Sequence, residues 1–510
     1  MHFNKGLLTK TGKFQPSFDS LRAYECPRWF RDAKLGFWSH WGPQSVPMAG
    51  DWYARNMYIQ GQPQYLYHLR HYGHPFKFGY KDLVKLWKAE KFDPEGLMEL
   101  FAKAGARYFV AQAMHHDHFF NFQSKYNRFN SAQIGPMKDI CGLWKKAADR
   151  HGLPFGLSEH LGATFSWWAV NKGADAYGPY AGILYDGNDP AYRDFYMNNY
   201  EDIAKDGDRT RLTCWYTANS SHHKYWLSVI KELIDLFSPD LLYTDGGLPF
   251  GYCRDGGHEY SAPVNHPDYL YGLDAVSYLY NKSIEKNGEN KAVYLQKDRR
   301  EAIYLIGILD IEKSQLPEVQ EKPWQTDTCI GNWFYDAKQV FKRPNHIIEM
   351  LVDIISKNGT MLLIILQLPD GSIDDETNYL LEELASWIAI AGEGIYGTRP
   401  WHVSGEGYSS VLIEGFREVA VNWTETDFRF TAKEKTVYAF IMKSPENRCS
   451  VLRSFKAEEK ITSVKLLGLG SVPFNWNYGV LAVKLPEQLP TPYLNCLAIE
   501  LSENQTDKTI

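Results

Sequence analysis

The sequence predicts an α/β protein, a (β/α)8-like TIM barrel followed by a C-terminal antiparallel β-sandwich. Three observations favour this fold class. From about residue 90, a capped amphipathic helix, a glycine, an apolar strand and a polar cluster recur in that order. Polar clusters end several of these strands and no GxGxxG turn lies among them, which favours a closed barrel over an open sheet. Short alternating strands then fill about the last hundred residues.

The first repeating unit covers residues 93–118. Asp93 is expected to cap a helix that begins at Pro94 and carries an apolar stripe up to residue 104. Residues 108–114 then form an apolar run that predicts a buried strand. The unit ends in the polar cluster at residues 115–118.

Two further units follow the same order. Residues 140–147 carry a helical stripe, Gly152 is a plausible helix end, and the strand at 154–157 leads to Glu159 and His160. The third helix is striped over residues 230–237 and leads into the strand DLLYTDGG, residues 240–247. Asp245 therefore stands at the end of a strand in a βα series.

The alternation of helices and strands ends after SWIAIAGEGIYGTRPW, residues 386–401. Beyond it, runs such as TVYAFIM and NCLAIEL alternate apolar and polar residues between turn signals. We therefore expect a barrel domain over residues 1–400 and a β-sandwich domain over residues 401–510.

Asp245 is the first candidate for chemistry. An aspartate before two glycines is often only a turn residue whose carboxylate caps nearby N–H groups. However, Tyr243 and Asp245 share one face of the strand, and the active sites of such barrels lie at the carboxyl ends of the strands. The position therefore favours a functional carboxylate.

A hydrolase that cleaves acetals needs a second carboxyl group to protonate the leaving oxygen. The segment YLIGILDIEKSQLPEVQEKPWQ offers Asp310, Glu312, Glu318 and Glu321. Glu312 follows directly on an apolar strand, whereas Glu318 lies in a proline-bounded loop where a solvated charge is the usual reading. We favour Glu312 as the acid/base, with Glu318 as the alternative.

The cluster AMHHDHFF invites a metal site, because His115, His116, Asp117 and His118 are all competent ligands. On an extended strand, however, His115 and Asp117 would point to one side and His116 and His118 to the other. We therefore predict no metal and assign His115 and His116 to binding sugar hydroxyls. A structural hydrogen-bonding role is the alternative.

Aromatic residues make up 15% of the chain, including 33 Tyr and 16 Trp, and they are dense in residues 35–58. Aromatic faces pack cores, but they also stack on the C–H faces of sugar rings. This segment places His40, Asp51 and Trp52 among the aromatics, which suits a pocket for a sugar.

Composition excludes other partners. The net charge is -6 and no basic block occurs, so we expect neither nucleic acid nor a membrane as partner. No run of 18 apolar residues is present. The seven cysteines are scattered and never in CxxC spacing, which indicates neither a disulfide framework nor zinc.

Taken together, these stretches resemble the α-L-fucosidases of glycoside hydrolase family 29. The matching motifs are GFWSHWGPQSVP with GDWYARNMY, HHDHFFNFQSKYNRFNS, PDLLYTDGG, WQTDTCIGNWFY, LVDIISKNGTMLL and GEGIYGTRPW. They follow the family's order across residues 35–401. The resemblance implies a retaining exo-glycosidase that uses no cofactor.

The resemblance also implies roles for individual residues. Asp245 matches the family's nucleophile, and the DIEKS segment resembles the part that carries the acid/base in one branch of the family, hence Glu312. His40, His115, His116 and Trp52 match residues that bind the sugar hydroxyls in relatives. Trp324 is expected beside Glu312, where an apolar ring would raise the pKa of the acid/base.

Three departures from the family pattern concern the substrate. Asp51 stands where many members have glutamate, His160 lies where many have a tyrosine-rich strand end, and Lys297 replaces an arginine. A lysine offers a point charge in place of a planar fork. We expect a carbohydrate with a terminal α-L-fucosyl group as substrate, with an α-L-galactosyl group as the alternative. The remaining alternatives are a metal-dependent hydrolase that uses the cluster at residues 115–118 and a carbohydrate-binding protein without catalytic activity.

The resemblance leaves the compartment and the oligomeric state open. The start, MHFNKGLLTKTGKF, lacks the apolar stretch of a signal peptide. We favour a periplasmic or secreted protein whose leader was removed, because relatives that degrade glycans often work outside the cytoplasm. A cytoplasmic protein is the alternative.

Overall fold

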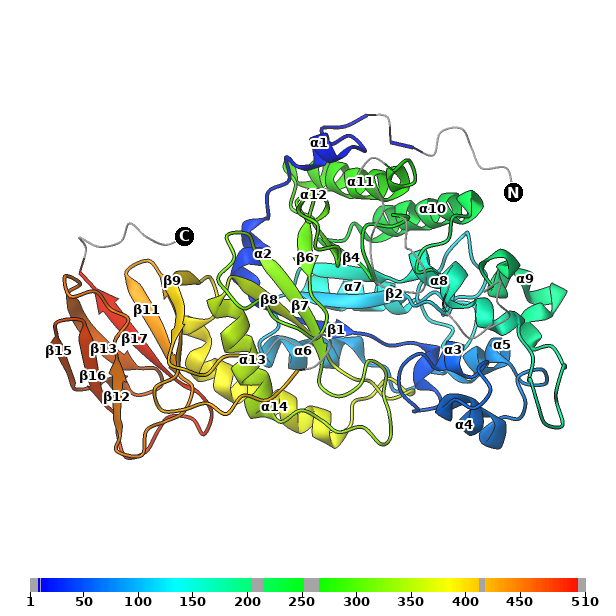
Figure 1. The fold of residues 1–510 in the computed structure, drawn as a ribbon. Helices are drawn as coiled ribbons and strands as arrows, with labels where there is room; N and C mark the ends of the chain where they lie inside the picture. The colour runs from blue at the N-terminus through cyan, green and yellow to red at the C-terminus, as the bar shows by residue number, and fades with distance from the viewer. Residues whose placement is uncertain are drawn as a thin grey trace.

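The computed structural model describes residues 8–9, 11–203, 212, 214–251, 266–411 and 418–502. The first domain is a closed barrel of eight parallel strands in sequence order, as Figure 1 shows at its centre. The expected barrel is therefore confirmed. Its strands are β1 Leu35–Ser39, β2 Phe109–Met114, β3 Phe155–Glu159, β4 Leu241–Thr244, β5 Val293–Gln296, β6 Ile308–Asp310, β7 Trp324–Cys329 and β8 Gly359–Ile364.

Helices cover the outside of the barrel, since each carries an apolar face that must be buried. They connect successive strands everywhere except between β6 and β7, where a loop that contains Glu312 runs directly from one strand to the next. The main covering helices are α6 Pro94–Lys103, α7 Ile140–Arg150, α8 Leu161–Trp167, α10 Ser220–Phe237, α11 Tyr269–Asn287, α12 Glu301–Tyr304, α13 Pro344–Ser356 and α14 Asp375–Ala391.

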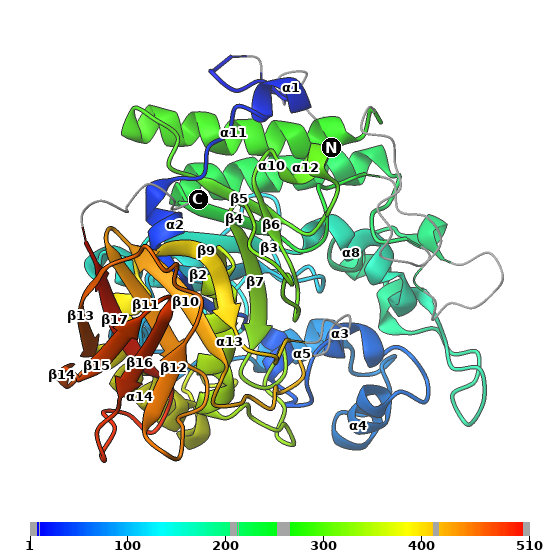
Figure 2. The same ribbon diagram turned by 60° about the vertical axis from the view of Figure 1, so that its left-hand side comes forward.

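The shorter helices lie at the N-terminus and in the long loops after β1 and β3. They are α1 Phe18–Leu21, α2 Arg28–Ala33, α3 Tyr53–Asn56, α4 Pro63–His71, α5 Tyr80–Leu83 and α9 Arg193–Tyr196. In Figure 2, α3, α4 and α5 lie together on one side of the barrel. Of the three, α3 lies within the aromatic segment 35–58, which begins with β1.

Local sequence signals set the helix ends. The Asp93 side chain accepts a hydrogen bond from the Gly96 N–H, and Pro94 is the first residue of α6, as predicted. Gly152 has a φ of 65°, a left-handed conformation that glycine adopts without strain, and it lies two residues beyond the end of α7.

The barrel interior is filled by side chains and is not a pore. The Tyr108 ring packs directly against Gly36 of β1. A Cβ at residue 36 would come within 2.2 Å of this ring, so only glycine fits there. The Tyr108 hydroxyl donates to Gln325 Oε1 at 2.7 Å, and Gln325 Nε2 donates to Asp310 Oδ1 at 2.7 Å. This chain of hydrogen bonds leads from the packed interior to the carboxyl ends of the strands.

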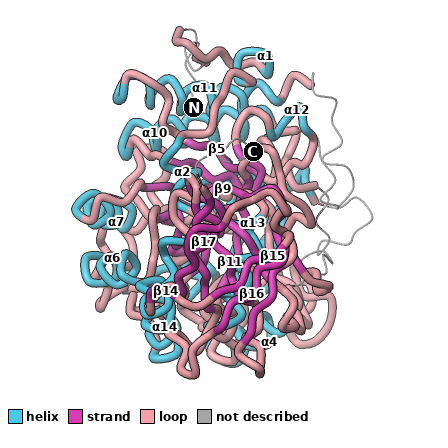
Figure 3. Tube along the Cα trace, turned by 90° about the vertical axis from the view of Figure 1, so that its left-hand side faces the viewer, coloured by secondary structure: helices cyan, strands magenta, loops and turns pink. Residues whose placement is uncertain are grey.

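The second domain consists of two antiparallel sheets that enclose their own apolar core, as predicted (Figure 3). The six-stranded sheet has the order β14-β13-β17-β11-β10-β9, and the three-stranded sheet has the order β12-β16-β15. Their bounds are β9 Arg399–Glu406, β10 Phe428–Lys433, β11 Thr436–Ile441, β12 Cys449–Leu452, β13 Ile461–Leu466, β14 Gly470–Ser471, β15 Phe474–Asn477, β16 Val480–Lys484 and β17 Asn495–Leu501.

The boundary between residues 400 and 401 stays a prediction, and in the structure it falls within β9. Six of the cysteines are free thiols, and Cys253 lies outside the described residues. Among the described helices, none combines the length and the apolar character that crossing a bilayer requires.

Candidate active site

A cavity of about 770 Å³ opens at the carboxyl ends of the barrel strands. Predicted site residues reach it directly from six consecutive strands, because each stands one or two positions beyond the end of a strand. The cavity lining includes His40 after β1, His115 and His116 after β2, His160 after β3, Asp245 after β4, Lys297 after β5 and Glu312 after β6. The barrel thus brings together residues that are far apart in the sequence.

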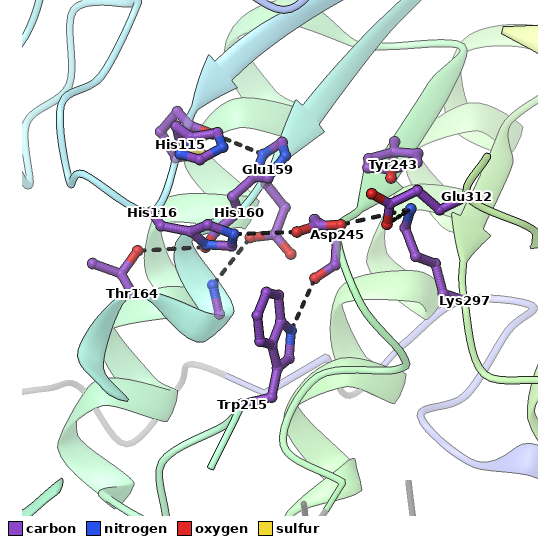
Figure 4. Close-up of polar contacts among 12 residues, drawn as sticks. His115, His116, Glu159, His160, Thr164, Trp215, Tyr243, Asp245, Lys297 and Glu312 are labelled. Carbon is purple, nitrogen blue, oxygen red and sulfur yellow. Dashed lines mark hydrogen bonds and ion pairs between the residues drawn. The ribbon is translucent and has the colours of Figure 1, made fainter. Parts of the chain in front are cut away.

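Asp245 lies at the centre of this set (Figure 4). Its Oδ2 is 3.2 Å from His116 Nε2, its Oδ1 is 3.8 Å from Lys297 Nζ, and its backbone carbonyl accepts from Trp215 Nε1 at 3.4 Å. Burial alone would raise the pKa of Asp245, but the hydrogen bond from His116 and the charge of Lys297 hold this pKa well below its usual value. The carboxylate is therefore ionised and pre-oriented.

His116 faces an acceptor with each ring nitrogen. Its Nδ1 is 2.8 Å from the carbonyl oxygen of His160, and its Nε2 is 3.2 Å from the carboxylate of Asp245. A carbonyl and a carboxylate can only accept, so each contact requires His116 to donate. His116 therefore orients the carboxylate of Asp245 through a hydrogen bond.

Glu312 has the opposite electrostatic environment. Burial raises the pKa of Glu312 to about 7, with Lys297 opposing that rise and the nearby Asp327 and Asp245 adding to it. Its Oε2 accepts from Lys297 Nζ at 2.8 Å. One carboxyl group of the site is thus kept ionised while a second holds a proton near neutrality, the division of roles that acid/base chemistry requires.

Lys297 lies against four carboxyl groups of the protein. We expected its ammonium to bind substrate in place of an arginine, and that role stays a prediction. Its Nζ is 2.8 Å from Glu312, 3.3 Å from Asp327, 3.5 Å from Asp310 and 3.8 Å from Asp245. Lys297 still lines the cavity, yet its donors are directed towards the protein's own carboxyl groups.

Three histidines present ring nitrogens to the cavity with fixed proton positions. His40 Nδ1 donates to the Trp333 carbonyl at 3.0 Å, and His160 Nδ1 donates to the Met114 carbonyl at 3.2 Å, which leaves Nε2 of both rings as an acceptor. His115 is reversed, because its Nδ1 accepts from Gln44 Nε2 at 2.8 Å and its Nε2 therefore carries the proton.

The same three rings form the one group of ligand atoms in the described residues that is close enough to hold a metal ion. The donor pattern does not suit a metal, however. Gln44 Oε1 accepts from the Ala54 N–H at 3.1 Å, which fixes the amide orientation and hence the proton on His115 Nε2. Two acceptors and one donor are the pattern that sugar hydroxyls can satisfy.

Burial sets the charge state of this histidine group as well. It lowers the pKa of His40 to about 3, and it holds the pKa of His115 and of His160 well below the usual value. All three rings are therefore neutral near pH 7 and offer hydrogen bonds without a charge.

Asp51 and Trp52 also line the cavity, at the start of α3. Burial raises the pKa of Asp51 to about 7, and its Oδ1 is buried without a hydrogen-bond partner among the described residues. Trp52 packs edge-on against Trp167 with ring centroids 5.5 Å apart. A buried polar atom without a partner is costly, so Asp51 is available to a ligand hydroxyl.

Trp324 was wrongly expected at the site. It is the first residue of β7, pairs with the first residue of β8, and donates its indole N–H to the Lys357 carbonyl at 2.9 Å. It therefore lies at the amino end of the barrel, and it cannot affect the pKa of Glu312 as proposed from the sequence. Trp324 begins β7, whereas the cavity lies at the carboxyl end of that strand, so its side chain is far from the cavity along the strand.

The alternation expected for residues 115–118 was also wrong, because β2 ends at Met114 and the chain turns there. His115 and His116 both line the cavity, whereas Asp117 and His118 do not. The Asp117 carboxylate accepts from the Tyr80 hydroxyl at 2.5 Å, and His118 Nδ1 is 2.8 Å from the Phe195 carbonyl. The last two residues of the cluster are structural.

The two carboxylates of the proline-bounded loop do not reach the cavity. Glu318 and Glu321 are exposed, and neither is part of the lining. The sequence also missed Trp215, which lies 5.1 Å from His116 between ring centroids, and Asp327, which is buried within β7. A signal for Asp327 was present, since a buried barrel strand that reads QTDT carries polar groups that need partners.

A closed (β/α)8 barrel with an ionised carboxylate and a protonated carboxyl group around a sugar-sized cavity defines the glycoside hydrolase class. Comparison with known proteins identifies the family. The sequence profile of the Alpha-L-fucosidase family matches residues 2–393, and that of the Alpha-L-fucosidase C-terminal domain matches residues 422–500. The chain belongs to the α-L-fucosidase family, as its motifs indicated.

Individual relatives agree with this assignment. The chain is 28% identical to the tissue alpha-L-fucosidase of Mus musculus over 494 residues, which cover 94% of this chain and 92% of that protein. It is 26% identical to the tissue alpha-L-fucosidase of Homo sapiens over 465 residues, which cover 90% of this chain and 84% of that protein.

Solved structures show the same fold. The Thermotoga maritima alpha-fucosidase in complex with fucose superposes with a TM-score of 0.71 at 23% identity, covering 95% of this chain and 100% of that one. A trapped covalent intermediate of a family GH29 alpha-L-fucosidase from Bacteroides thetaiotaomicron has a TM-score of 0.64 at 17% identity, covering 97% of this chain and 98% of that one.

Proposed function

We propose that this chain releases terminal α-L-fucose from glycans with retention of configuration, with Asp245 as nucleophile and Glu312 as acid/base. The observation that carries the proposal is the shared contact of both carboxyl groups with Lys297. Asp245 Oδ1 is 3.8 Å and Glu312 Oε2 is 2.8 Å from Nζ, so these oxygens are at most about 6.6 Å apart, the two distances added. Retaining glycosidases have the shorter carboxyl separation, and inverting enzymes need room for a water between the two groups.

In the first step, an oxygen of Asp245 attacks the anomeric carbon while the bond to the leaving oxygen breaks. Glu312 gives its proton to that oxygen, so the products are a glycosyl ester of Asp245, a neutral alcohol and an ionised Glu312. The electrostatics support these roles, because His116 and Lys297 stabilise the carboxylate of Asp245 while burial keeps the proton on Glu312.

In the second step, Glu312 takes a proton from water, and the hydroxide oxygen attacks the anomeric carbon from the side that the alcohol left. The ester bond to Asp245 breaks, which restores both carboxyl groups and retains the configuration of the sugar. No step requires a metal or an organic cofactor.

Substrate binding rests on the rim of the same cavity. His40 and His160 accept hydrogen bonds from sugar hydroxyls, His115 donates one, and Asp51 Oδ1 accepts a further one. Trp52 contributes an apolar ring to the lining, suited to the C–H face of a pyranose.

The first test is Asp245→Ala. We expect turnover of 4-nitrophenyl α-L-fucoside to fall by more than about a thousandfold, because the nucleophile acts as a unit with its acid/base. The far-UV circular dichroism should be unchanged. Near-normal turnover by a folded Asp245→Ala protein would refute the mechanism.

The acid/base is tested by comparing Glu312→Ala with Glu318→Ala. Glu312→Ala should lose about 10²- to 10⁴-fold in rate on substrates with a poor leaving group, and azide should restore turnover of an activated aryl fucoside. Glu318→Ala, an exposed change, should behave as the parent protein. Azide rescue of the Glu318 variant alone would reverse the assignment.

L-Fucose is the 6-deoxy form of L-galactose, so the alternative substrate differs by one hydroxyl. An apolar wall discriminates against an added hydroxyl by only about 100-fold, whereas a wall that hydrogen-bonds the hydroxyl rejects the deoxy sugar more strongly. The ratio of kcat/KM for the 4-nitrophenyl α-L-fucoside and α-L-galactoside decides between the two. A ratio below one would make the galactoside the preferred substrate.

A further inference from the structure

The ammonium of Lys297 lies among more carboxyl groups than it can neutralise. Beneath the two catalytic carboxyl groups lie Asp310, at the end of β6, and Asp327, within β7. Both are almost completely buried, and neither is needed as nucleophile or acid/base. If all four carboxyl groups were ionised, a single lysine would face four negative charges in a largely buried cluster, which is unfavourable.

The geometry of Asp310 and Asp327 shows how this excess is removed. Both carboxyl groups lie against the same ammonium, Asp310 Oδ2 at 3.5 Å and Asp327 at 3.3 Å from Lys297 Nζ. Burial and the nearby Asp327 raise the pKa of Asp310 well above its usual value. Asp327 accepts from the Tyr243 hydroxyl at 3.1 Å and lies 3.3 Å from Lys297 Nζ with both oxygens. Asp310 Oδ1 accepts from Gln325, whereas its buried Oδ2 accepts no hydrogen bond among the described residues.

We propose that Asp310 and Asp327 share one proton, which lies on Asp310, and that the pair acts as a positioning group that holds one negative charge beneath Glu312. This inference deepens the proposed function, since it rests on Glu312 as the acid/base. It assigns a role to two buried residues of the cavity lining that contact Lys297.

The shared proton limits the negative charge of the site. Asp245 and the Asp310–Asp327 pair contribute one negative charge each, Lys297 contributes one positive charge, His116 donates to Asp245, and Glu312 is neutral. When Asp245 forms the ester and Glu312 loses its proton, the negative charge moves from one side of Lys297 to the other. The total does not change, so the buried cluster gains no unpaired charge during the reaction.

Titratable groups face Glu312 and the pair from every side of the pocket. They are Tyr108 before β2, His116 after β2, Tyr243 in β4, Asp245 after β4, Lys297 after β5, Lys313 in the loop after β6 and Asp51 before α3. The number of protons bound is therefore a property of the whole coupled cluster. It can be followed through the pH at which Glu312 loses its proton.

The test uses Asp310→Asn, because asparagine has the shape of the protonated acid and its oxygen can still accept from Gln325. In this variant the pair still carries one negative charge, on Asp327. The alkaline limb of the kcat/KM profile should therefore stay at the pH of the parent protein. In the double variant D310N/D327N the pair is neutral. Glu312 then loses its proton more easily, and the limb should move to lower pH by about one unit or more.

Two outcomes would overturn the proposal. If both aspartates were ionised in the parent protein, Asp310→Asn alone would remove a negative charge and move the limb to lower pH. If both were protonated, the double variant would leave the limb where it is. The readout is a position on the pH axis, so a general loss of activity cannot imitate either result.

A second measurement needs no activity. The infrared carbonyl stretch of a protonated carboxyl group should persist in the parent protein at about pH 9, far above the ordinary carboxyl pKa, and vanish in Asp310→Asn. Glu312→Gln should leave that band in place. The absence of such a band from the parent protein would overturn the shared proton, whereas failure of azide rescue at Glu312 would overturn the acid/base assignment instead.

Discussion

At the scale of single residues, the two catalytic carboxyl groups are distinguished by their neighbours. Lys297 contacts both groups, but Asp245 also has His116 beside it, whereas Glu312 is partly buried with further acids nearby. Identical chemistry in the side chains thus gives one anion and one acid at the same pH.

The pH dependence of kcat/KM follows from this difference. Glu312 must hold its proton, so activity should fall as the pH rises through about 7, the raised pKa of its carboxyl group. Asp245 must be ionised, and its lowered pKa puts the acidic limb well below the usual aspartate value. In Glu312→Gln, measured on an activated aryl fucoside, the alkaline limb should be absent. A limb that persisted at the same pH would belong to another group.

Gln44 controls the proton position on His115, and Gln44→Glu should reverse it. A carboxylate accepts from Nδ1–H, so Nε2 would lose its proton and the cavity would lose a donor. We expect KM for 4-nitrophenyl α-L-fucoside to rise about tenfold, the worth of one hydrogen bond. Gln123→Glu, which adds the same charge at an exposed position, is the control and should leave KM unchanged. Equal KM values for both variants would exclude the tautomer as a determinant of binding.

The scale of helices and strands explains which features could be read from the sequence. The end of a parallel strand has a local signature, an apolar run followed by polar residues, so His40, His160 and Asp245 were found without coordinates. The caps of α6 were equally local.

The errors concern information that is not local. Nothing near Lys297 in the sequence tells that Asp310 and Asp327 converge on it from β6 and β7. The turn that ends β2 at Met114 depends on packing beyond the HHDH cluster, and the position of Trp324 depends on where β7 begins. Sequence patterns predict the elements, and only their assembly shows which side chains meet.

Helix α6 offers a test of one such local signal. Asp93→Ala removes the acceptor for the Gly96 N–H and should lower the free energy of unfolding by about 1 kcal/mol. The helix lies outside the barrel, so kcat should be unchanged. Asp93→Asn keeps a capping oxygen and should unfold at nearly the denaturant concentration of the parent protein. A loss of the same size in both variants would show that the charge, and not the cap, stabilises α6.

At the scale of the whole molecule, the two domains are joined by a buried ion pair. Arg429 Nε of β10 donates to Asp353 Oδ1 of α13 at 2.5 Å, and the other carboxylate oxygen accepts from Lys357 Nζ at 2.6 Å. The contact ties the first sheet of the β-sandwich to a helix that covers the barrel.

Arg429→Met should destabilise the protein by about 3 kcal/mol, because one oxygen of a buried carboxylate loses its partner. Denaturant unfolding followed by tryptophan fluorescence measures the change. Arg399→Met is the matched control, since Arg399 pairs with Asp32 across the same two domains at 2.7 Å but is partly exposed. It should lose about 1 kcal/mol or less. Losses of equal size would contradict the importance of burial.

The filled barrel beneath the cavity has a consequence for work on long polymers. A polysaccharide cannot thread through the barrel, because packed side chains such as Tyr108 and Trp38 close the cavity from below. Only the end of a polysaccharide chain can therefore enter. The speed of digestion is then proportional to the number of chain tips and independent of the mass of polymer. A mixture with an enzyme that cuts internally, and so multiplies tips, should liberate sugar faster than the two acting in turn on separate samples.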